Sequence, residues 1–152
     1  MKMMITYDGS EASQFALKES LKMARSMGAE LTLYTCVEVM NYYAPVSIEG
    51  ASQVWGPTME QGVKEYVKEV GDKLTEEAQE ICQGAEISYT HIVEEGQPRE
   101  NICNFAQENQ IDLLVVGSRG LGVIKRMLLG SVSQYVINHA PCSVLVMRPK
   151  GA

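Results

Sequence analysis

The chain has 152 residues, 45% hydrophobic and 21% charged, which is ordinary for one globular domain with a sizeable core, expected here to span residues 1–152. The formal net charge of −6 and the lack of a dense basic run argue against nucleic acid or an anionic membrane surface as the main partner. No apolar run is long enough to cross a membrane, and the first residues turn polar too early for a signal peptide, so the sequence predicts a cytoplasmic protein without membrane contact.

The N-terminal part of the chain predicts a strand, a helix and a second strand. Residues 3–7 are a short apolar run, and the turn that follows places Ser10 as a favourable helix N-cap. Apolar residues then recur at helical spacing until Gly28, a residue typical of a helix C-terminus. Residues 31–39 have the pattern of a second strand.

Residues 41–58 are rich in Gly, Pro, Ser and Asn and contain Trp55. A loop of about 18 residues is longer than most connections and indicates either a functional lid or partner surface, or a partly disordered insertion. The sequence does not decide between these two interpretations.

The middle of the chain predicts an amphipathic helix over residues 59–82, a third strand over 85–93 and a helix over 100–109. Pro98 suits the first turn of that last helix. We expect His91 in the third strand and His139 near the end of a helix, and neither histidine has a partner at metal-ligand spacing. The cysteines are dispersed and are predicted to be reduced, small core residues: Cys36, Cys82, Cys103 and Cys142.

The most informative pattern is an apolar run followed by two glycine clusters. Residues 111–116 are typical of a buried parallel strand, and they lead directly into Gly117-Ser118-Arg119-Gly120. Nine residues later, Gly130-Ser131 opens an apolar-periodic helix. Glycines free the backbone to turn its N–H groups toward an anion, and a helix N-terminus attracts anions, so this layout predicts a phosphate cradle.

Simpler interpretations of the glycines exist, since a lone Gly-x-x-Gly is most often an ordinary turn. A P-loop is excluded because Val123 stands where lysine is required, and no Gly-x-Gly-x-x-Gly follows the first strand. A last strand is expected over residues 143–147, after the break at Pro141.

Five strands that alternate with four helices predict an α/β fold, with a mostly parallel sheet covered by helices on both faces. In such sheets a ligand binds beyond the carboxyl ends of the strands, where the strand order reverses. If the first and fourth strands are neighbours there, Asp8 and the glycine loop share one crevice.

These residues resemble the universal stress protein family, specifically its ATP-binding branch. The branch motif Gly-x-x-Gly, nine residues, Gly-(Ser/Thr) is met at Gly117, Gly120, Gly130 and Ser131. The resemblance covers essentially the whole chain. It implies a flavodoxin-like (Rossmann-like) single sheet in the order 3-2-1-4-5, ATP as ligand, and a homodimer through the last strand, Ser143 to Met147.

The same resemblance implies a set of binding residues. Adenine and ribose are expected beside Asp8 and Val37, with Val116 and Gly117 lining the adjacent wall. The phosphates are expected over Gly120, Gly130, Ser131, Val132 and Ser133. Thr6 and Arg119 complete the expected set of binding residues, although both depart from the family pattern: Thr6 stands near a position that is proline in several relatives, and Arg119 stands where histidine is frequent.

Several of these residues have two possible roles. Asp8 is suited to accept hydrogen bonds from a ribose hydroxyl or an adenine amine, or to hold a metal through water, but it also fits a helix cap. The Ser131 and Ser133 hydroxyls can donate to phosphate oxygens. Arg119 either contacts a phosphate or is a solvated loop charge, and the same holds for Lys125 and Arg126. Mg²⁺ or Mn²⁺ is expected to bind mainly through phosphate oxygens.

No side chain beside the loop is an evident water-orienting group, and the sequence offers no catalytic triad or close pair of carboxylates. We therefore expect no catalytic residue and no metal site of the protein's own. The predicted function is an ATP-binding regulatory protein of the stress response, with an unidentified protein partner and little or no hydrolysis. A slow ATPase or nucleotidyl-transferring enzyme is one alternative, and a nucleotide-free dimerisation module is another.

Overall fold

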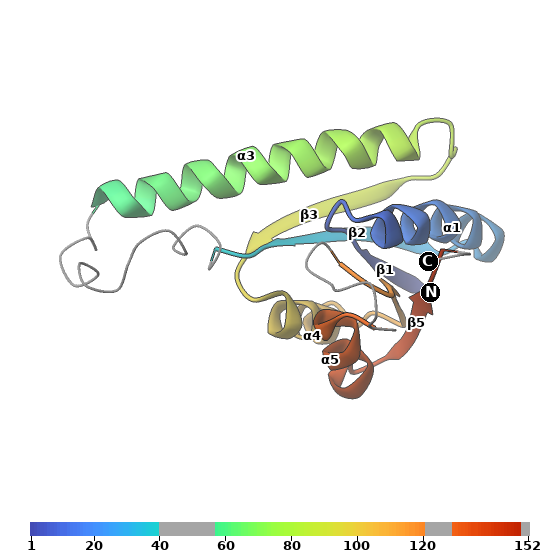
Figure 1. The fold of residues 1–152 in the computed structure, drawn as a ribbon. Helices are drawn as coiled ribbons and strands as arrows, with labels where there is room; N and C mark the ends of the chain where they lie inside the picture. Colours follow the sequence, from blue (N-terminus) through green and yellow to red (C-terminus); the bar gives the residue numbers. More distant parts are fainter. Residues whose placement is uncertain (40–56, 121–128, 150–152) are drawn as a thin grey trace.

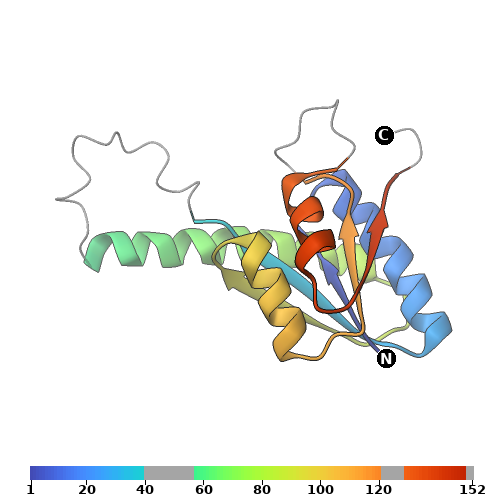
Figure 2. The same cartoon turned by 90° about the horizontal axis from the view of Figure 1, so that it is seen from below.

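The computed structural model describes residues 1–39, 57–120 and 129–149, and within them five parallel strands form one sheet in the order β3-β2-β1-β4-β5 (Figures 1 and 2). The predicted fold and strand order are confirmed. The elements, in chain order, are β1 (Lys2–Thr6), α1 (Glu11–Met27), β2 (Glu30–Val37), α3 (Pro57–Cys82), β3 (Tyr89–Glu95), α4 (Pro98–Glu108), β4 (Leu113–Gly117), α5 (Ser131–His139) and β5 (Ser143–Met147).

Helices cover both faces of the sheet, with α1 and α3 on one face and α4 and α5 on the other (Figures 1 and 2). Successive side chains of a strand point to opposite faces, so Met3 and Ile5 pack with α1 whereas Met4 packs with α4. All three side chains are fully buried. This burial on both faces explains why the strands are continuous apolar runs.

β1 lies at the centre of the sheet and pairs with β2 on one side and β4 on the other. Met3 is in register with Leu31 of β2 and with Leu113 of β4. The strand order reverses between β1 and β4, so the expectation that these two strands are neighbours at the reversal is confirmed. Their carboxyl ends bring Asp8 and the glycine loop to the same edge of the sheet.

The ends of α1 follow the sequence prediction. The Ser10 side chain accepts a hydrogen bond from the Ser13 N–H at 3.2 Å, so Ser10 is the N-cap. Gly28 ends the helix in the left-handed conformation, with φ of 59°, and its N–H bonds the carbonyls of the last turn.

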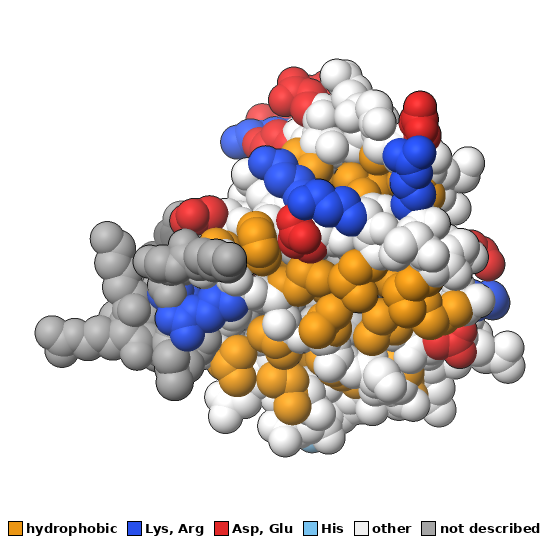
Figure 3. Space-filling model, turned by 90° about the vertical axis from the view of Figure 1, so that its right-hand side faces the viewer, with side chains coloured by type: hydrophobic (Ala, Val, Ile, Leu, Met, Phe, Trp, Pro, Cys, Tyr) orange, Lys and Arg blue, Asp and Glu red, His pale blue; other side chains and the backbone are white. Residues whose placement is uncertain are grey.

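β5 forms one edge of the described sheet. Its last four side chains, residues 144–147, are half-buried against the two hydrophobic clusters and keep part of their apolar surface exposed. Figure 3 shows hydrophobic side chains gathered across the face on which this edge lies.

Some predicted boundaries were wrong. The third strand begins at Tyr89, not at residue 85, although Ala85 and Ile87 pack against the core as a strand pattern suggests. α3 begins at Pro57, so the end of the predicted loop is helical. The rest of that loop, including Trp55, lies outside the described residues, as do Lys125 and Arg126.

The remaining expectations about single residues mostly hold. His91 lies in β3 and His139 is the last residue of α5, as predicted. All four cysteines are free, but only Cys103 is buried and the other three are half-buried. None of the described helices has the length and apolarity required to span a membrane.

Candidate functional site

A cavity of about 520 Å³ lies at the carboxyl ends of the strands. All of the binding residues expected from the sequence line it: Thr6, Asp8, Val37, Val116, Gly117, Arg119, Gly120, Gly130, Ser131, Val132 and Ser133. The cavity therefore gathers segments from the ends of β1, β2 and β4 and from the start of α5.

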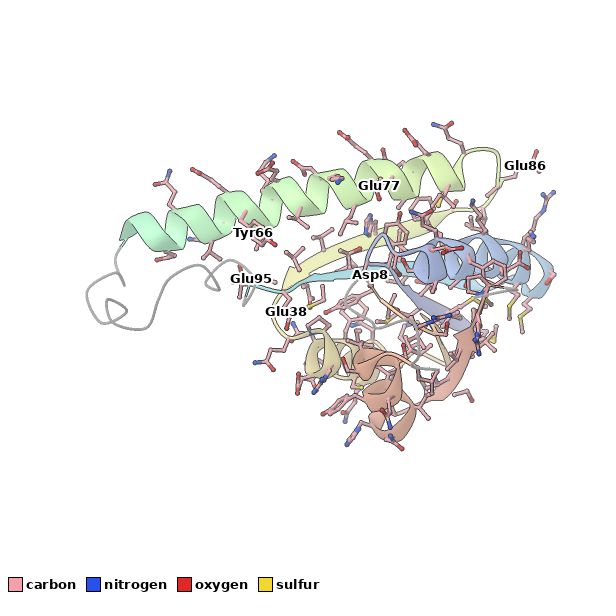
Figure 4. All side chains as sticks on the ribbon, viewed as in Figure 1. Asp8, Glu38, Tyr66, Glu77, Glu86 and Glu95 are labelled. Carbon is pink, nitrogen blue, oxygen red and sulfur yellow. The ribbon has the colours of Figure 1, made fainter. Side chains whose placement is uncertain are left out.

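Asp8, labelled in Figure 4, follows β1, and its carboxylate lies close to Gly120 of the glycine loop. Its Oδ1 accepts a hydrogen bond from the Ser10 N–H at 3.0 Å, so Asp8 does stabilise the turn before α1. Its other oxygen, Oδ2, lies so near Gly120 that a Cβ added there would be 2.5 Å away. Asp8 thus faces the loop while it also holds the turn.

Gly117 allows the end of β4 to pack directly on the start of α1. A Cβ at this position would lie 2.9 Å from the carbonyl carbon of Ala12 and 2.9 Å from the Ser13 nitrogen, both backbone atoms. The Ser10 hydroxyl also donates to the Arg119 carbonyl at 3.2 Å. These contacts fix the glycine loop against α1, on one wall of the cavity.

Internal hydrogen bonds join the two glycine clusters. The Gly130 N–H donates to the Ser118 carbonyl at 2.8 Å, and the Ser133 hydroxyl donates to the Gly117 carbonyl at 2.6 Å. The expectation that these two groups donate to phosphate was therefore wrong for this structure, because both protons are used to hold the loop to α5. The spacing of residues in the sequence could not show these partners.

The first turn of α5 still presents backbone N–H groups to the cavity. Gly130 is the N-cap, and the first intrahelical bond runs from the Gln134 N–H to the Gly130 carbonyl at 2.9 Å. The N–H groups of Ser131 and Val132 precede that bond, so the helix does not use them. Ser131 is exposed and lines the same space.

The other end of the cavity is apolar. Val37, at the end of β2, is 4% exposed and lines it, whereas Val116, at the end of β4, is 1% exposed and belongs to the same hydrophobic cluster as Val136 of α5. Sequence analysis missed the helical residues that close this end, namely Tyr66, Val70 and Leu74 of α3 and Pro98 and Ile102 of α4. Their only signal was an apolar repeat every four residues, which an ordinary core helix also has.

Cys36 and Tyr7 line the cavity and would be nucleophiles or bases if they lost their protons, but both stay protonated at neutral pH. Burial, with the charges of Glu94 and Glu38, raises the pKa of the Cys36 thiol to about 12. Burial, with the charges of Glu77 and Asp8, raises the pKa of the Tyr7 hydroxyl to about 12. At neutral pH these groups are uncharged, so neither is an activated catalytic group.

The described residues contain no group of three His, Cys, Asp or Glu side chains arranged to hold a metal ion. The cavity does offer oxygen donors, the Asp8 carboxylate and the Ser131 hydroxyl, and the Arg119 side chain is a cation at its rim. The lining of the cavity thus combines the N-terminus of α5 and the cationic Arg119 side chain with several apolar side chains.

Comparison with known proteins agrees with this architecture. The sequence model of the universal stress protein family matches residues 1–148. Universal stress protein YxiE of Bacillus subtilis is 34% identical over 148 residues, which cover 97% of this chain and 98% of YxiE.

Solved structures show the same fold. The universal stress protein UspA from Lactobacillus plantarum is 25% identical, with a TM-score of 0.75 and 97% of each chain covered. A family member from Arabidopsis thaliana, solved with AMP bound, is 21% identical, with a TM-score of 0.65 over 99% of this chain and 93% of its own. The chain belongs to the universal stress protein family.

Proposed function

We propose that this protein binds ATP in the cavity at the carboxyl ends of the strands and acts as a nucleotide-dependent regulatory module. One observation carries the proposal: the residues of the two glycine clusters, Asp8 and the valines of β2 and β4 all line one space of about 520 Å³. A volume of this size suits a small-molecule ligand.

The two ends of the cavity match the two ends of a nucleotide. Backbone N–H groups of Ser131 and Val132, together with Arg119, suit the phosphates. The apolar side chains of Val37 and Val116 suit the base, and the Asp8 carboxylate in the same cavity suits the ribose hydroxyls as an acceptor. The AMP bound to the Arabidopsis relative supports a nucleotide as the ligand class.

Mg²⁺ or Mn²⁺ fits this site as a companion of the phosphates. Both ions prefer oxygen ligands, and Asp8 and Ser131 supply a carboxylate and a hydroxyl at the cavity. When bound, the ion would neutralise phosphate charge next to the Asp8 carboxylate. Since no cluster of three ligating side chains occurs among the described residues, phosphate oxygens would supply most of its coordination.

Hydrolysis is expected to be slow or absent. Phosphoryl transfer needs a group that orients the attacking water. Asp8 is the carboxylate beside the glycine loop that could orient such a water, but its Oδ1 already accepts a hydrogen bond from the Ser10 N–H. Turnover at about one per second or faster would instead favour the alternative of an ATPase or nucleotidyl-transferring enzyme.

We further propose that the protein is a homodimer joined through β5. The outer edge of this strand has no partner strand within the described chain, and its apolar side chains are half-buried. An exposed strand edge flanked by apolar surface favours association with a second copy (Figure 3). A cytoplasmic location and a protein partner of the dimer remain predictions from the sequence.

Isothermal calorimetry with nucleotide-stripped protein tests ATP binding. Wild type should bind Mg-ATP at micromolar to millimolar concentration, and Gly120→Asn should abolish binding because its Cβ collides with Asp8. Gly84→Asn is the matched control, since a Cβ at Gly84 has no atom within 4 Å and asparagine tolerates its φ of 77°. If titration of wild type with Mg-ATP gives no binding heat, the proposal is rejected in favour of a nucleotide-free dimerisation module.

A further inference from the structure

The glycine loop, residues 117–120, is joined to the last residue of β5. Gly117 pairs with Met147 in the register of β4 and β5, and the next residue, Ser118, donates its N–H to the Met147 carbonyl at 2.8 Å. Ser118 is 1% exposed, and breaking a buried backbone bond costs free energy because water does not replace the lost partner. The loop that lines the cavity is therefore held firmly to the end of β5.

The carbonyl of the same residue holds the start of α5. It accepts the Gly130 N–H at 2.8 Å, and the preceding carbonyl, that of Gly117, accepts the Ser133 hydroxyl at 2.6 Å. Ser118 thus uses its N–H for β5 and its carbonyl for α5. Because both glycine clusters line the cavity, the cavity wall, the first turn of α5 and the end of β5 form one hydrogen-bonded unit.

β5 is also the strand through which the proposed homodimer forms. It is an edge of the described sheet, with β4 as its neighbour (Figure 2). Met147 is therefore the end of the proposed interface and, at the same time, the acceptor that holds the glycine loop. A ligand that fixes the loop should fix the end of β5 as well, and a second copy paired with β5 should fix the loop.

We propose that nucleotide binding and dimer formation are linked through Ser118, so that each strengthens the other. This inference rests on the proposed nucleotide-binding function and on the proposed homodimer, and it adds the means by which one controls the other. Phosphates bound at the glycine clusters order the loop before β5 pairs with a second copy, so the pairing then loses less conformational entropy. Linkage is reciprocal, so ATP must strengthen the dimer by the same factor as the dimer strengthens ATP binding.

The opposite side of the cavity offers an internal comparison. There the Tyr7 N–H donates to the Tyr34 carbonyl, also at 2.8 Å, where β1 ends beside β2. In the sheet, β4 separates these two strands from β5. The coupling should therefore come from the phosphates, which contact the glycine clusters, and not from the nucleoside, which is proposed to contact Asp8 and Val37.

Fluorescence-detected sedimentation of wild type tests the linkage without any substitution. Mg-ATP and Mg-tripolyphosphate should each lower the dissociation constant of the dimer about tenfold, within the usual range for coupled sites, and adenosine should leave it unchanged. By reciprocity, a monomeric Leu145→Lys variant should bind ATP about tenfold more weakly than the wild-type dimer, although Leu145 does not line the cavity. Ile137→Lys, on the exposed surface of α5, is the matched control and should keep the wild-type affinity for ATP.

Hydrogen exchange of single backbone amides, followed by NMR, locates the coupling. Exchange of the Ser118 amide should slow when ATP is added, and it should also slow when the protein concentration is raised through the range in which the dimer forms. The Tyr7 amide makes a bond of the same length at the other side of the cavity, so its exchange should not depend on protein concentration.

The outcomes separate this inference from the proposals on which it rests. A wild type that binds ATP and dimerises, but whose dimer is no tighter with ATP, would overturn the linkage and leave both proposals in place. If adenosine tightens the dimer as much as tripolyphosphate does, or if the Tyr7 amide responds to dimer formation as the Ser118 amide does, the route through Ser118 is wrong. Absence of ATP binding would refute the proposed function together with the linkage, and a monomeric wild type would refute the proposed interface together with it.

Discussion

The Asp8 carboxylate occupies the space that a side chain at position 120 would need. A Cβ on Gly120 would lie 2.5 Å from Asp8 Oδ2, although the two residues belong to turns far apart in the sequence. The glycine therefore allows the loop after β4 to approach the acid after β1. Because Oδ1 of the same carboxylate accepts the Ser10 N–H, displacement of Asp8 would also disturb the start of α1.

Gly120→Ala should destabilise the protein by about 1 kcal/mol, the usual contribution of one hydrogen bond, because Asp8 must move. In an Asp8→Ala background the same glycine substitution should cost much less, since the obstructing carboxylate is gone. Urea unfolding of the wild type, both single variants and the double variant measures this coupling. Additive losses would mean that Gly120 is required for another reason.

Alanine substitutions of Ser131 and Ser133 should have different effects, one on ATP affinity and the other on the stability of the fold. Ser133→Ala removes a buried hydroxyl that donates to the Gly117 carbonyl at 2.6 Å, so it should lower the free energy of unfolding by about 1–3 kcal/mol. Ser131→Ala changes an exposed residue and should reduce ATP affinity with little effect on unfolding. Thermal unfolding without ligand, followed by ATP calorimetry, distinguishes them, and the opposite pattern would contradict the assignment.

His91 should make the protein less stable in mild acid. Its Nε2 lies 3.0 Å from Thr35 Oγ1, and its Nδ1 is buried without a hydrogen-bond partner among the described residues. Burial lowers the pKa of this imidazole below its usual value of 6.5. The unfolded chain therefore binds a proton near pH 6.5 while the folded chain does not, so the free energy of unfolding falls as pH drops below about 6.5.

Urea unfolding at pH 7.5 and pH 5.5 checks this pH dependence. His91→Gln should show a smaller loss between the two pH values than wild type. His139→Gln is the matched control, because His139 is exposed at the end of α5 and its replacement should preserve the wild-type loss. An identical loss in wild type and His91→Gln would show that other groups cause the acid sensitivity.

A lysine on β5 should dissociate the proposed homodimer. Leu145→Lys places a charge on the edge strand, and charges at strand edges oppose pairing with a second chain. Sedimentation velocity should show a dimer for wild type and a monomer for this variant. Ile137→Lys, on the exposed surface of α5, should remain dimeric. A monomeric wild type, or a dimeric Leu145→Lys with native circular dichroism, would refute this interface.

The sequence predicted the elements better than their ends. The apolar pattern from Ala85 onward indicated a strand, but pairing begins only where Leu31 of β2 faces Tyr89. Ala85 and Ile87, which precede that point, pack on the core without joining the sheet. A strand boundary depends on the length of its partner, and a pattern within one segment does not contain that information.

The sequence predicted those parts of the candidate site that lie in the turns directly after strands. Glycines and Asp8 follow strands directly, so their place at the edge of a parallel sheet follows from topology. Tyr66 and Ile102 could not be recognised, because an apolar repeat is the same whether a helix faces a sheet or a cavity. The internal bonds of Gly130 and Ser133 depend on how two loops meet, which spacing alone does not specify.

The central position of β1 has a consequence for synthesis on the ribosome. β1 is synthesised long before β4, yet one of its two edges pairs only with Leu113 and its neighbours in β4. A nascent chain that ends before this point exposes an unpaired apolar edge at the middle of its future sheet, which is a risk for aggregation and a surface for chaperones. Contacts between residues so distant along the chain also slow folding.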